Sequence, residues 1–381
     1  MSISSFSFPT AIRFGAGARK DVGKHLRKRG LQRPLIVTDK ALAALPVLKE
    51  FRKHLDELDV AVFSGVFGNP TASQAMAGAD AFKSHRADCV IGFGGGAALD
   101  VAKVVGIAAT HEGNIIEYAW DHPKVRTIEQ PLPYFVAMPT TSGTGSEVGR
   151  AAVVTNEKTH TKKIIFHPKM LPTQTICDPE LTVGMPPVIT AGTGMDAFSH
   201  ALEALCVPSY HALADGIAAE GVRLVKENLV TAYKDGTNIE ARAHMMAAAA
   251  AGATAFQKGL GAIHALSHPV GALYDTHHGL TNAVFAPYVL VFNRRAIEDK
   301  VKRLAAYIGL RPSFRAFLDF VLELREQIGI PHTLQGLKVD DSKVDTIVKM
   351  APEDPTAGGN PVKLDRRAAR TIFMRALEGR I

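Results

Sequence analysis

The sequence predicts an α/β domain over residues 1–187, followed by an all-helical domain over residues 188–381. Two observations predict this division. In the first half, short runs of β-branched residues alternate with amphipathic stretches, which is typical of βαβ units around a parallel sheet. After residue 187 these runs disappear, and Ala, Leu, His and Met recur at helical spacing. No internal repeat is visible.

The N-terminal half contains several strand candidates separated by helical stretches such as residues 73–85. The strand candidates are residues 35–39, 60–64, 89–93 and 135–138. Two further runs, 151–155 and 163–166, are separated by polar residues and predict a hairpin. The C-terminal half predicts helices over residues 191–207, 212–233, 239–256, 261–274, 295–308, 314–328 and 368–377.

Composition excludes several classes of protein. The chain has 381 residues, 46% hydrophobic and 21% charged, so it can bury a large core. Its net charge of +7 is spread without a long basic run, so we expect no nucleic-acid partner; the mild positive charge suits anionic cofactors or substrates. The longest apolar stretch, residues 245–256, is too short to span a bilayer, and the N-terminus lacks signal-peptide features. We expect a cytoplasmic protein without a membrane partner.

The cysteines favour a reducing compartment. Cys89, Cys177 and Cys206 are far apart, which is neither a disulfide framework nor a zinc-finger spacing. We interpret them as small buried hydrophobic residues rather than as catalytic thiols.

A glycine triplet follows the third strand candidate. Gly94, Gly95 and Gly96 lie between a buried strand run and a helix, where the backbone can approach a phosphate closely. The spacing is not the G-x-G-x-x-G fingerprint, because Leu99 occupies its last glycine position. A plain tight turn is the alternative, and the flanking strand and helix favour the phosphate site.

A second polar loop follows the fourth strand candidate. Residues 139–147 carry small hydroxyl side chains and two glycines, which suit a pyrophosphate or ribose wall at the carboxyl end of a strand. Asp39 ends the first strand candidate, where a carboxylate can bind an adenosine ribose and repel a 2′-phosphate. Its alternative role is the N-cap of the next helix.

Histidines concentrate in the helical half. Seven of the 15 lie between residues 200 and 278. Asp196 and His200 are four residues apart and share a helix face, and His264 and His268 repeat this spacing. A carboxylate with several histidines on inward helix faces predicts a site for Fe²⁺, Zn²⁺ or Mn²⁺.

Together these motifs resemble the iron-containing (group III) alcohol dehydrogenase family over essentially the full length. The resemblance rests on residues 94–103, 139–148, 194–200, 264–272 and 358–361. It implies an N-terminal dinucleotide-binding α/β domain and a C-terminal helical metal-binding domain, an architecture like that of dehydroquinate synthase.

The resemblance also implies site residues. The implied metal ligands are Asp196, His200, His264 and His278. Of the adjacent His277 and His278 only one can face the metal, and the family ligand directly precedes a glycine, which selects His278. His268 is implied as a proton relay. The implied cofactor-binding residues are Asp39, Asn69, Gly95, Gly96, Thr140, Thr141, Thr144 and Lys162, with Lys163 as the alternative to Lys162. The implied cofactors are NAD, ahead of NADP, and Fe²⁺, with Zn²⁺ as the alternative metal.

Two positions depart from the family pattern. Ala97 replaces the serine that usually follows the glycine triplet, and Ala255 stands where a pocket phenylalanine is common. Lys258 and Arg150 could offer positive charge to an acidic substrate tail, so we expect a short ω-hydroxy acid or its semialdehyde ahead of plain alkanols or diols.

The resemblance implies hydride transfer between a nicotinamide and a primary alcohol or aldehyde. The alternatives are a hydroxyacid–oxoacid transhydrogenase, a non-redox enzyme like dehydroquinate synthase, and a metal-binding protein without turnover, against which the phosphate loop argues. Relatives lead us to expect a homodimer or a larger homo-oligomer.

Overall fold

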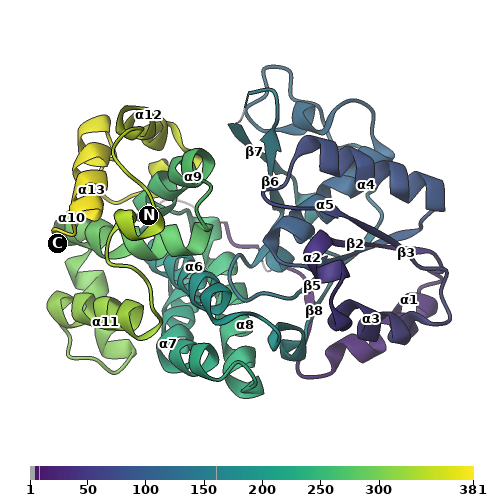
Figure 1. The fold of residues 1–381 in the computed structure, drawn as a ribbon, viewed down its shortest axis with the longest axis horizontal. Coiled ribbons are helices and arrows are strands. Elements are labelled where there is room, and N and C mark those ends of the chain that lie inside the picture. Colours follow the sequence, from purple (N-terminus) through teal and green to yellow (C-terminus); the bar gives the residue numbers. More distant parts are fainter. Residues whose placement is uncertain (1–4, 8, 160) are drawn as a thin grey trace. The chain divides into compact units, whose positions relative to one another are not determined.

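The computed structural model describes residues 5–7, 9–159 and 161–381 and divides them into an α/β unit and a helical unit (Figure 1). The α/β unit contains residues 9–141 and 145–183. The helical unit contains residues 184–381 with the short segments 5–7 and 142–144. The chain therefore passes from one unit to the other near residue 183, and residues 142–144 of the Thr/Ser loop belong to the helical unit.

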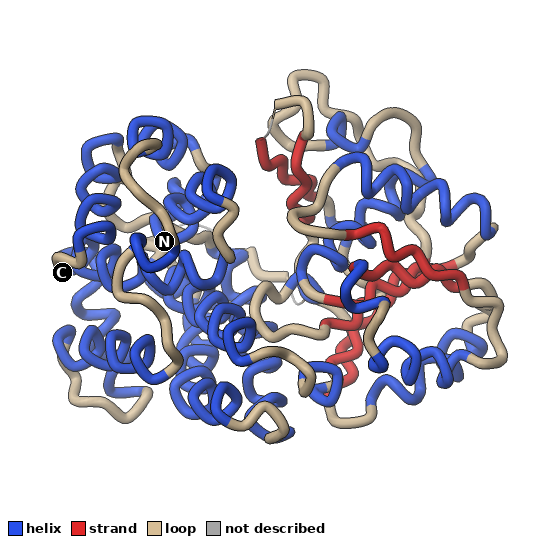
Figure 2. The backbone as a smooth tube through the Cα atoms, viewed as in Figure 1, coloured by secondary structure: helices blue, strands red, loops and turns tan. Residues whose placement is uncertain are grey.

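A six-stranded parallel sheet forms the centre of the α/β unit (Figure 2). Its order is β1 (Ala11–Phe14), β8 (Gln174–Cys177), β5 (Tyr134–Pro139), β4 (Cys89–Gly94), β2 (Pro34–Asp39) and β3 (Ala61–Val66). The four predicted strands and their parallel arrangement are confirmed. The sequence analysis missed β1 and β8, which have four residues each and no long apolar run.

Helices cover both faces of this sheet because its central strands are apolar on both sides. Ile36, Ile91 and Val136 pack with α1 (Val22–Lys28) and α3 (Pro46–Arg52). Leu35, Val37 and Val90 face the other way and pack with α5 (Gly96–Thr110). The predicted helix over residues 73–85 is α4 (Ala72–His85), which packs against α5. A short helix, α2 (Lys40–Ala43), follows β2 directly.

The register of the sheet brings the carboxyl ends of two strands together. Gly94, the last residue of β4, pairs with Pro139, the last residue of β5. The glycine triplet and the Thr/Ser loop therefore leave the sheet side by side. The predicted hairpin is also present, as β6 (Ala151–Asn156) and β7 (Thr161–Phe166).

The helical unit is built around α6 (Pro187–Cys206), which is buried along most of its length. The other helices are α7 (Ala212–Lys234), α8 (Ile239–Ala255), α9 (Ala262–Tyr274), α10 (His278–Tyr307), α11 (Phe314–Gln327), α12 (Val344–Met350) and α13 (Arg366–Glu378). They enclose one apolar core that includes Phe198, Phe285 and Phe317. None of the described helices is long and apolar enough to cross a membrane.

The prediction of a helix over residues 295–308 was wrong in its start, because α10 has 30 residues and begins at His278. Residues 281–290 of α10 are all buried, so no amphipathic period marks them, and Pro287 lies inside the helix. Packing against α6 and α11 maintains the helix there. The short helix α12 was also missed.

Candidate active site

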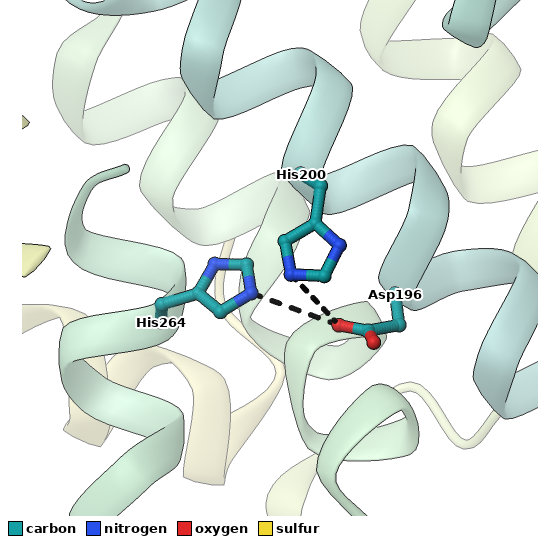
Figure 3. A group of neighbouring side chains, drawn as sticks. All are labelled: Asp196, His200 and His264. Carbon is teal, nitrogen blue, oxygen red and sulfur yellow. Dashed lines mark ion pairs between the residues drawn. The ribbon is translucent and has the colours of Figure 1, made fainter. Parts of the chain in front are cut away.

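Three donor groups meet in the buried interior of the helical unit. Asp196 and His200 lie one turn apart on α6, and His264 projects from α9 (Figure 3). The Asp196 Oδ1 atom lies 3.6 Å from His200 Nε2 and 3.6 Å from His264 Nε2. All three residues are at most 5% exposed. The donor atoms lie within 4.8 Å of one another, which is close enough for one metal ion to contact all three.

His278 approaches the same carboxylate oxygen from the first residue of α10. Its Nε2 atom lies 3.5 Å from Asp196 Oδ1. The neighbouring His277 instead caps α10, accepting a hydrogen bond from the Leu280 N–H, and its ring lies against Gly192 of α6. The two adjacent histidines thus point in different directions, and only His278 faces Asp196.

The close approach of α10 to α6 explains why a glycine, Gly279, follows His278. A Cβ atom at this position would lie 2.0 Å from the carbonyl oxygen of Gly192, so α10 starts in direct backbone contact with α6. This close approach places His278 one residue before the contact and next to the Asp196 turn of α6.

Two residues at this site were missed by the sequence analysis. Glu203 lies two turns after Asp196 on α6, and its Oε2 atom is 2.6 Å from His264 Nδ1. Asn282 lies one turn after His278, and its Nδ2 atom donates to Asp196 Oδ1 at 2.9 Å. Their spacing was the available signal, because residues 196, 200 and 203 share one helix face and so do residues 278 and 282.

The electrostatics of the group depend on burial and on the mutual contacts. Burial opposes ionisation of Asp196, but His200, His278 and His264 hold its pKa well below the usual range. Burial lowers the pKa of His200 to about 4. Burial also disfavours the charged form of His264, but Glu203 and Asp196 outweigh it and raise the pKa to about 9. The carboxylate and the neutral His200 can act as ligands directly, whereas His264 must first lose its Nε2 proton.

These donors fit a divalent metal ion. A tetrahedral ion with ligands at about 2.1 Å has ligand–ligand separations of about 3.4 Å, and the three separations from Asp196 Oδ1 are 3.5 to 3.6 Å. Imidazole and carboxylate ligands suit iron and zinc alike. Asn282 Oδ1 is buried without a hydrogen-bond partner among the described residues, while the nitrogen of the same amide contacts Asp196.

His268 lies next to the donor group and has its own carboxylate. Its Nδ1 atom is 2.8 Å from Asp354 Oδ2. Its ring stacks on His278 at a centroid distance of 5.4 Å, and its side chain is 23% exposed. Asp354 is held in turn by the backbone N–H and hydroxyl of Thr356. The orientation of His268 is therefore fixed, while part of its ring remains accessible.

In the α/β unit, the glycine loop and the Thr/Ser loop contact each other. Gly94 has φ +154°, and a Cβ atom there would lie 2.7 Å from Ala98 Cβ, so the position requires glycine. Gly95 is the N-cap of α5 and lies against the Thr141 side chain, and the Thr140 N–H donates to the Gly94 carbonyl at 3.0 Å. Together with Gly96, these residues form one backbone-rich surface at the positive end of α5.

Asp39 has its alternative role, the N-cap of the next helix, and its role toward a ribose stays a prediction. Its Oδ1 atom accepts a hydrogen bond from Leu42 N–H at 2.7 Å and so caps α2. Its Oδ2 atom lies on the side of Gly94, since a Cβ atom on that glycine would be 3.5 Å away. One oxygen is thus used structurally, and the other faces the glycine loop.

The remaining predicted cofactor residues come from three places. Asn69 lies in the turn between β3 and Thr71, the N-cap of α4. Lys162 lies on β7, near enough to α5 that its charge favours ionisation of the buried Asp100; Lys163 instead pairs with Asp121 at 2.7 Å. Thr144 lies in the segment 142–144, which is part of the helical unit.

The two cations expected to bind an acidic substrate have other partners. Lys258 is buried, and its ammonium pairs with Asp215 and donates to the Leu205 carbonyl near the end of α6. Arg150 lies over the Phe166 ring at 4.6 Å. The expectation that Lys258 contacts substrate was therefore wrong, because its charge caps the carboxyl end of a helix.

Ala255, where a pocket phenylalanine is common in the family, is followed directly by the aromatic residue Phe256. Ala255 itself is fully buried, and Phe256 places its ring 5.0 Å from the His200 ring. An aromatic ring therefore lies beside His200, one residue after the Ala255 position.

A parallel sheet with glycine loops at its strand ends, followed in the chain by a helical unit in which carboxylates and histidines converge, is typical of metal-dependent enzymes that use a dinucleotide cofactor. Residues 9–179 match the family described as iron-containing alcohol dehydrogenase, and residues 190–377 match its C-terminal family description. The chain belongs to the iron-containing alcohol dehydrogenase family.

Its relatives include enzymes for several short alcohols. The 1,3-propanediol dehydrogenase of Citrobacter freundii is 36% identical over 99% of this chain and 100% of its own length. The 4-hydroxybutyrate dehydrogenase of Cupriavidus necator is 36% identical over 97% of each chain. The structure also resembles that of sulfoacetaldehyde reductase from Bifidobacterium kashiwanohense in complex with NAD⁺, with a TM-score of 0.92, 28% identity and 99% coverage of both chains.

Proposed function

We propose that this protein is an NAD-linked, metal-dependent alcohol dehydrogenase and aldehyde reductase whose metal ligands are Asp196, His200, His264 and His278. The observation that supports this most directly is the convergence of three imidazole Nε2 atoms on one oxygen of Asp196, at 3.5 to 3.6 Å. The ligand set favours Fe²⁺, with Zn²⁺ as the alternative. A divalent ion held there supplies a Lewis acid that lowers the pKa of an alcohol hydroxyl.

The protein's own residues prepare the proton transfer. His268 is oriented by Asp354 through Nδ1, so its other ring nitrogen is available to accept the proton that leaves the alcohol. The pKa of Asp354 is lowered despite its burial, chiefly because of His268, so the carboxylate stays charged and can stabilise a protonated imidazole.

The dinucleotide is proposed to bind along the contacting loops of the α/β unit. The backbone N–H groups of Gly95, Gly96 and Thr141 and the hydroxyls of Thr140 and Thr141 are proposed to bind the pyrophosphate at the start of α5. Asn69, Thr144 and Lys162 are proposed to complete this site. Asp39 Oδ2 is proposed to bind the ribose and to disfavour the 2′-phosphate of NADP.

We propose a short primary alcohol with a second polar group as the substrate. The named activities of the relatives, on 1,3-propanediol and 4-hydroxybutyrate, support this choice. Lys258 pairs with Asp215 near the end of α6, so its charge does not by itself favour an acidic substrate over a diol.

The test is to assay the full chain, reloaded with Fe²⁺ or Zn²⁺, with NAD⁺ and 1,3-propanediol, 4-hydroxybutyrate or 1-butanol. A sustained rise in NADH absorbance with at least one of these alcohols supports the proposal. Turnover that needs a keto acid and releases no NADH would identify a transhydrogenase instead. Absence of any alcohol oxidation, with metal and NAD⁺ both bound, would contradict the proposed reaction.

A further inference from the structure

Glu203 uses both carboxylate oxygens at the start of α9. Oε2 lies 2.6 Å from Nδ1 of His264, and Oε1 accepts a hydrogen bond from the backbone N–H of Ile263 at 2.6 Å. The Glu203 side chain is only 5% exposed, so no water layer separates it from these partners. A buried carboxylate with two N–H donors is held in one orientation and in turn holds both donors.

The Gly358–Pro361 motif, which the proposed chemistry does not use, reaches the same helix start. Asn360 Oδ1 accepts the Ala262 N–H at 3.1 Å, and it also accepts from Asn293 Nδ2 at 2.8 Å. The Asn360 amide nitrogen donates to Asn293 Oδ1 and to the Val362 carbonyl. Gly359 permits the approach, because a Cβ atom there would lie 2.1 Å from the Leu260 carbonyl oxygen.

The first two N–H groups of α9 are thus each assigned to a side chain. Helix starts leave such groups without intrahelical partners, and Gly261, the N-cap residue, has no side chain to supply one. Glu203 and Asn360 replace the missing cap. A cavity of about 10 Å³, lined in part by Glu203, Asn293 and Asn360, leaves room for at most one water molecule beside them.

We propose that Glu203 is a positioning residue that fixes His264 in the tautomer with hydrogen on Nδ1, and that Asn360 holds the start of α9 in register for this contact. The inference rests on the proposed function only in taking His264 as a metal ligand. A carboxylate can only accept hydrogen bonds, so Glu203 keeps the hydrogen on Nδ1, and once the Nε2 proton has left, the Nε2 lone pair is the one offered to a metal.

Glu203→Gln separates this role from simple packing. Glutamine has the same shape but only one acceptor atom, so it can accept from His264 or from Ile263 and must present an N–H group to the other. The metal-free variant is expected to keep its helical content. Its affinity for metal is expected to fall about 10- to 100-fold, as for other partners of metal-bound histidines.

The experiment strips the full-length protein of metal and titrates it with Zn²⁺ against a competing chelator, and the visible spectrum of the Co²⁺ form is recorded in parallel. Glu203→Gln is expected to weaken Zn²⁺ binding and to change the Co²⁺ spectrum, and Asn360→Ala to weaken binding less. Glu220→Gln, which alters a partly exposed glutamate of α7 bound to Arg223 and Tyr307, is the control and is expected to bind Zn²⁺ normally.

Unchanged Zn²⁺ affinity in Glu203→Gln would overturn the inference. His264→Ala distinguishes this failure from failure of the proposed function. If His264 is not a metal ligand, the His264→Ala variant keeps full metal binding; if it is a ligand, the variant loses metal whatever Glu203 does. If Glu203→Gln does not fold, the nitrogen resonances of His264 in the unaltered Zn²⁺-loaded protein decide the matter. Hydrogen on Nδ1 supports the inference, and an unprotonated Nδ1 contradicts it.

Discussion

In the helical unit, Asp196, His200 and His264 are buried and lie against one another, whereas the two loops after β4 and β5 of the α/β unit, the proposed cofactor loops, contain glycines and threonines. The first site collects ionisable side chains from helices that are far apart in sequence. The second lies at adjacent ends of β4 and β5 and depends on the shape of the backbone. A metal requires fixed charges at short range, whereas a pyrophosphate is bound by a helix terminus and many weaker donors.

The α/β unit also contains ionisable side chains that are shielded from solvent, but these contact the loops from the interior of the unit. Lys103 of α5 donates to Ser146 Oγ and to the Ala151 carbonyl, each at 2.8 Å. Asp100 accepts from Ser146 Oγ and from the Val153 N–H. These contacts tie the Thr/Ser loop to α5 and to the hairpin, so they support the loop conformation. We therefore expect substitutions at the proposed metal ligands to abolish metal binding, and substitutions in the proposed cofactor loops to change only the affinity for the dinucleotide or the preference between NAD and NADP.

The largest effect is expected for His264→Ala. The variant loses one of the four proposed ligands and should bind Fe²⁺ or Zn²⁺ at least about 100-fold more weakly, with activity lost in parallel. Metal content after dialysis, measured together with alcohol oxidation, checks this. His244→Ala, which alters an exposed histidine of α8, should retain both. Full metal content in His264→Ala would remove His264 from the ligand set.

His268→Ala is expected to retain the metal but slow turnover. Because general acid–base groups contribute about 10²- to 10⁴-fold, kcat should fall by about 100-fold or more. Asp354→Asn should cause a smaller decrease, since it leaves the imidazole in place and removes only its charged partner. Rates measured over a range of pH test this role. A rate equal to that of the unaltered enzyme at every pH would exclude His268 from proton transfer.

The pH dependence of stability that Glu147 causes tests the effect of burial on an ionisable group of the α/β unit. Burial raises its pKa from 4.5 to about 7, so the folded protein binds a proton more tightly than the unfolded chain. The resulting stabilisation is complete below pH 4.5 and is lost as pH rises to 7, a loss of about 3 kcal/mol at about 1.4 kcal/mol per pKa unit.

Glu147→Gln cannot ionise and should be more stable than the unaltered protein at pH 8, by up to about 3 kcal/mol. Denaturant unfolding of both proteins at pH 5 and pH 8 measures the difference. Glu117→Gln is the control, because Glu117 is exposed and its pKa is lowered by its hydrogen bond with Arg126. A difference between Glu147→Gln and the unaltered protein that does not change with pH would contradict the raised pKa.

The smallest effect is expected at Asp39. Asparagine is an equally good N-cap, so Asp39→Asn should preserve α2 while removing the charge that faces the glycine loop. The ratio of kcat/KM for NAD⁺ to that for NADP⁺ should fall about tenfold, equivalent to roughly 1.4 kcal/mol. Asp39→Gly should reduce the preference for NAD⁺ over NADP⁺ by a similar factor, with a small additional loss of stability. A wild-type enzyme that prefers NADP⁺ would refute the assigned role.

The sequence was most informative where neighbouring residues carry the signal. The buried runs of β2, β4 and β5 and the glycines after β4 predicted the parallel sheet and its loops. The four-residue spacing of Asp196 and His200 predicted a shared helix face, because the helical period is local. Strands as short as β1 and β8 could not be recognised, since each has only four residues and they pair with each other from opposite ends of the α/β unit, Ala11 opposite Gln174.

The sequence by itself determined the two kinds of domain, the family and a pool of donor residues, since all of these follow from local patterns and motif order. Only the tertiary structure decided how those residues are used. It brought Glu203 to His264 and Asn360 to Ala262, and it directed Lys258 to Asp215 and the end of α6. Each of these contacts joins segments 43 to 98 residues apart. Which partner a buried charge contacts across such sequence separations depends on how the helices pack. No local pattern in the sequence encodes that packing.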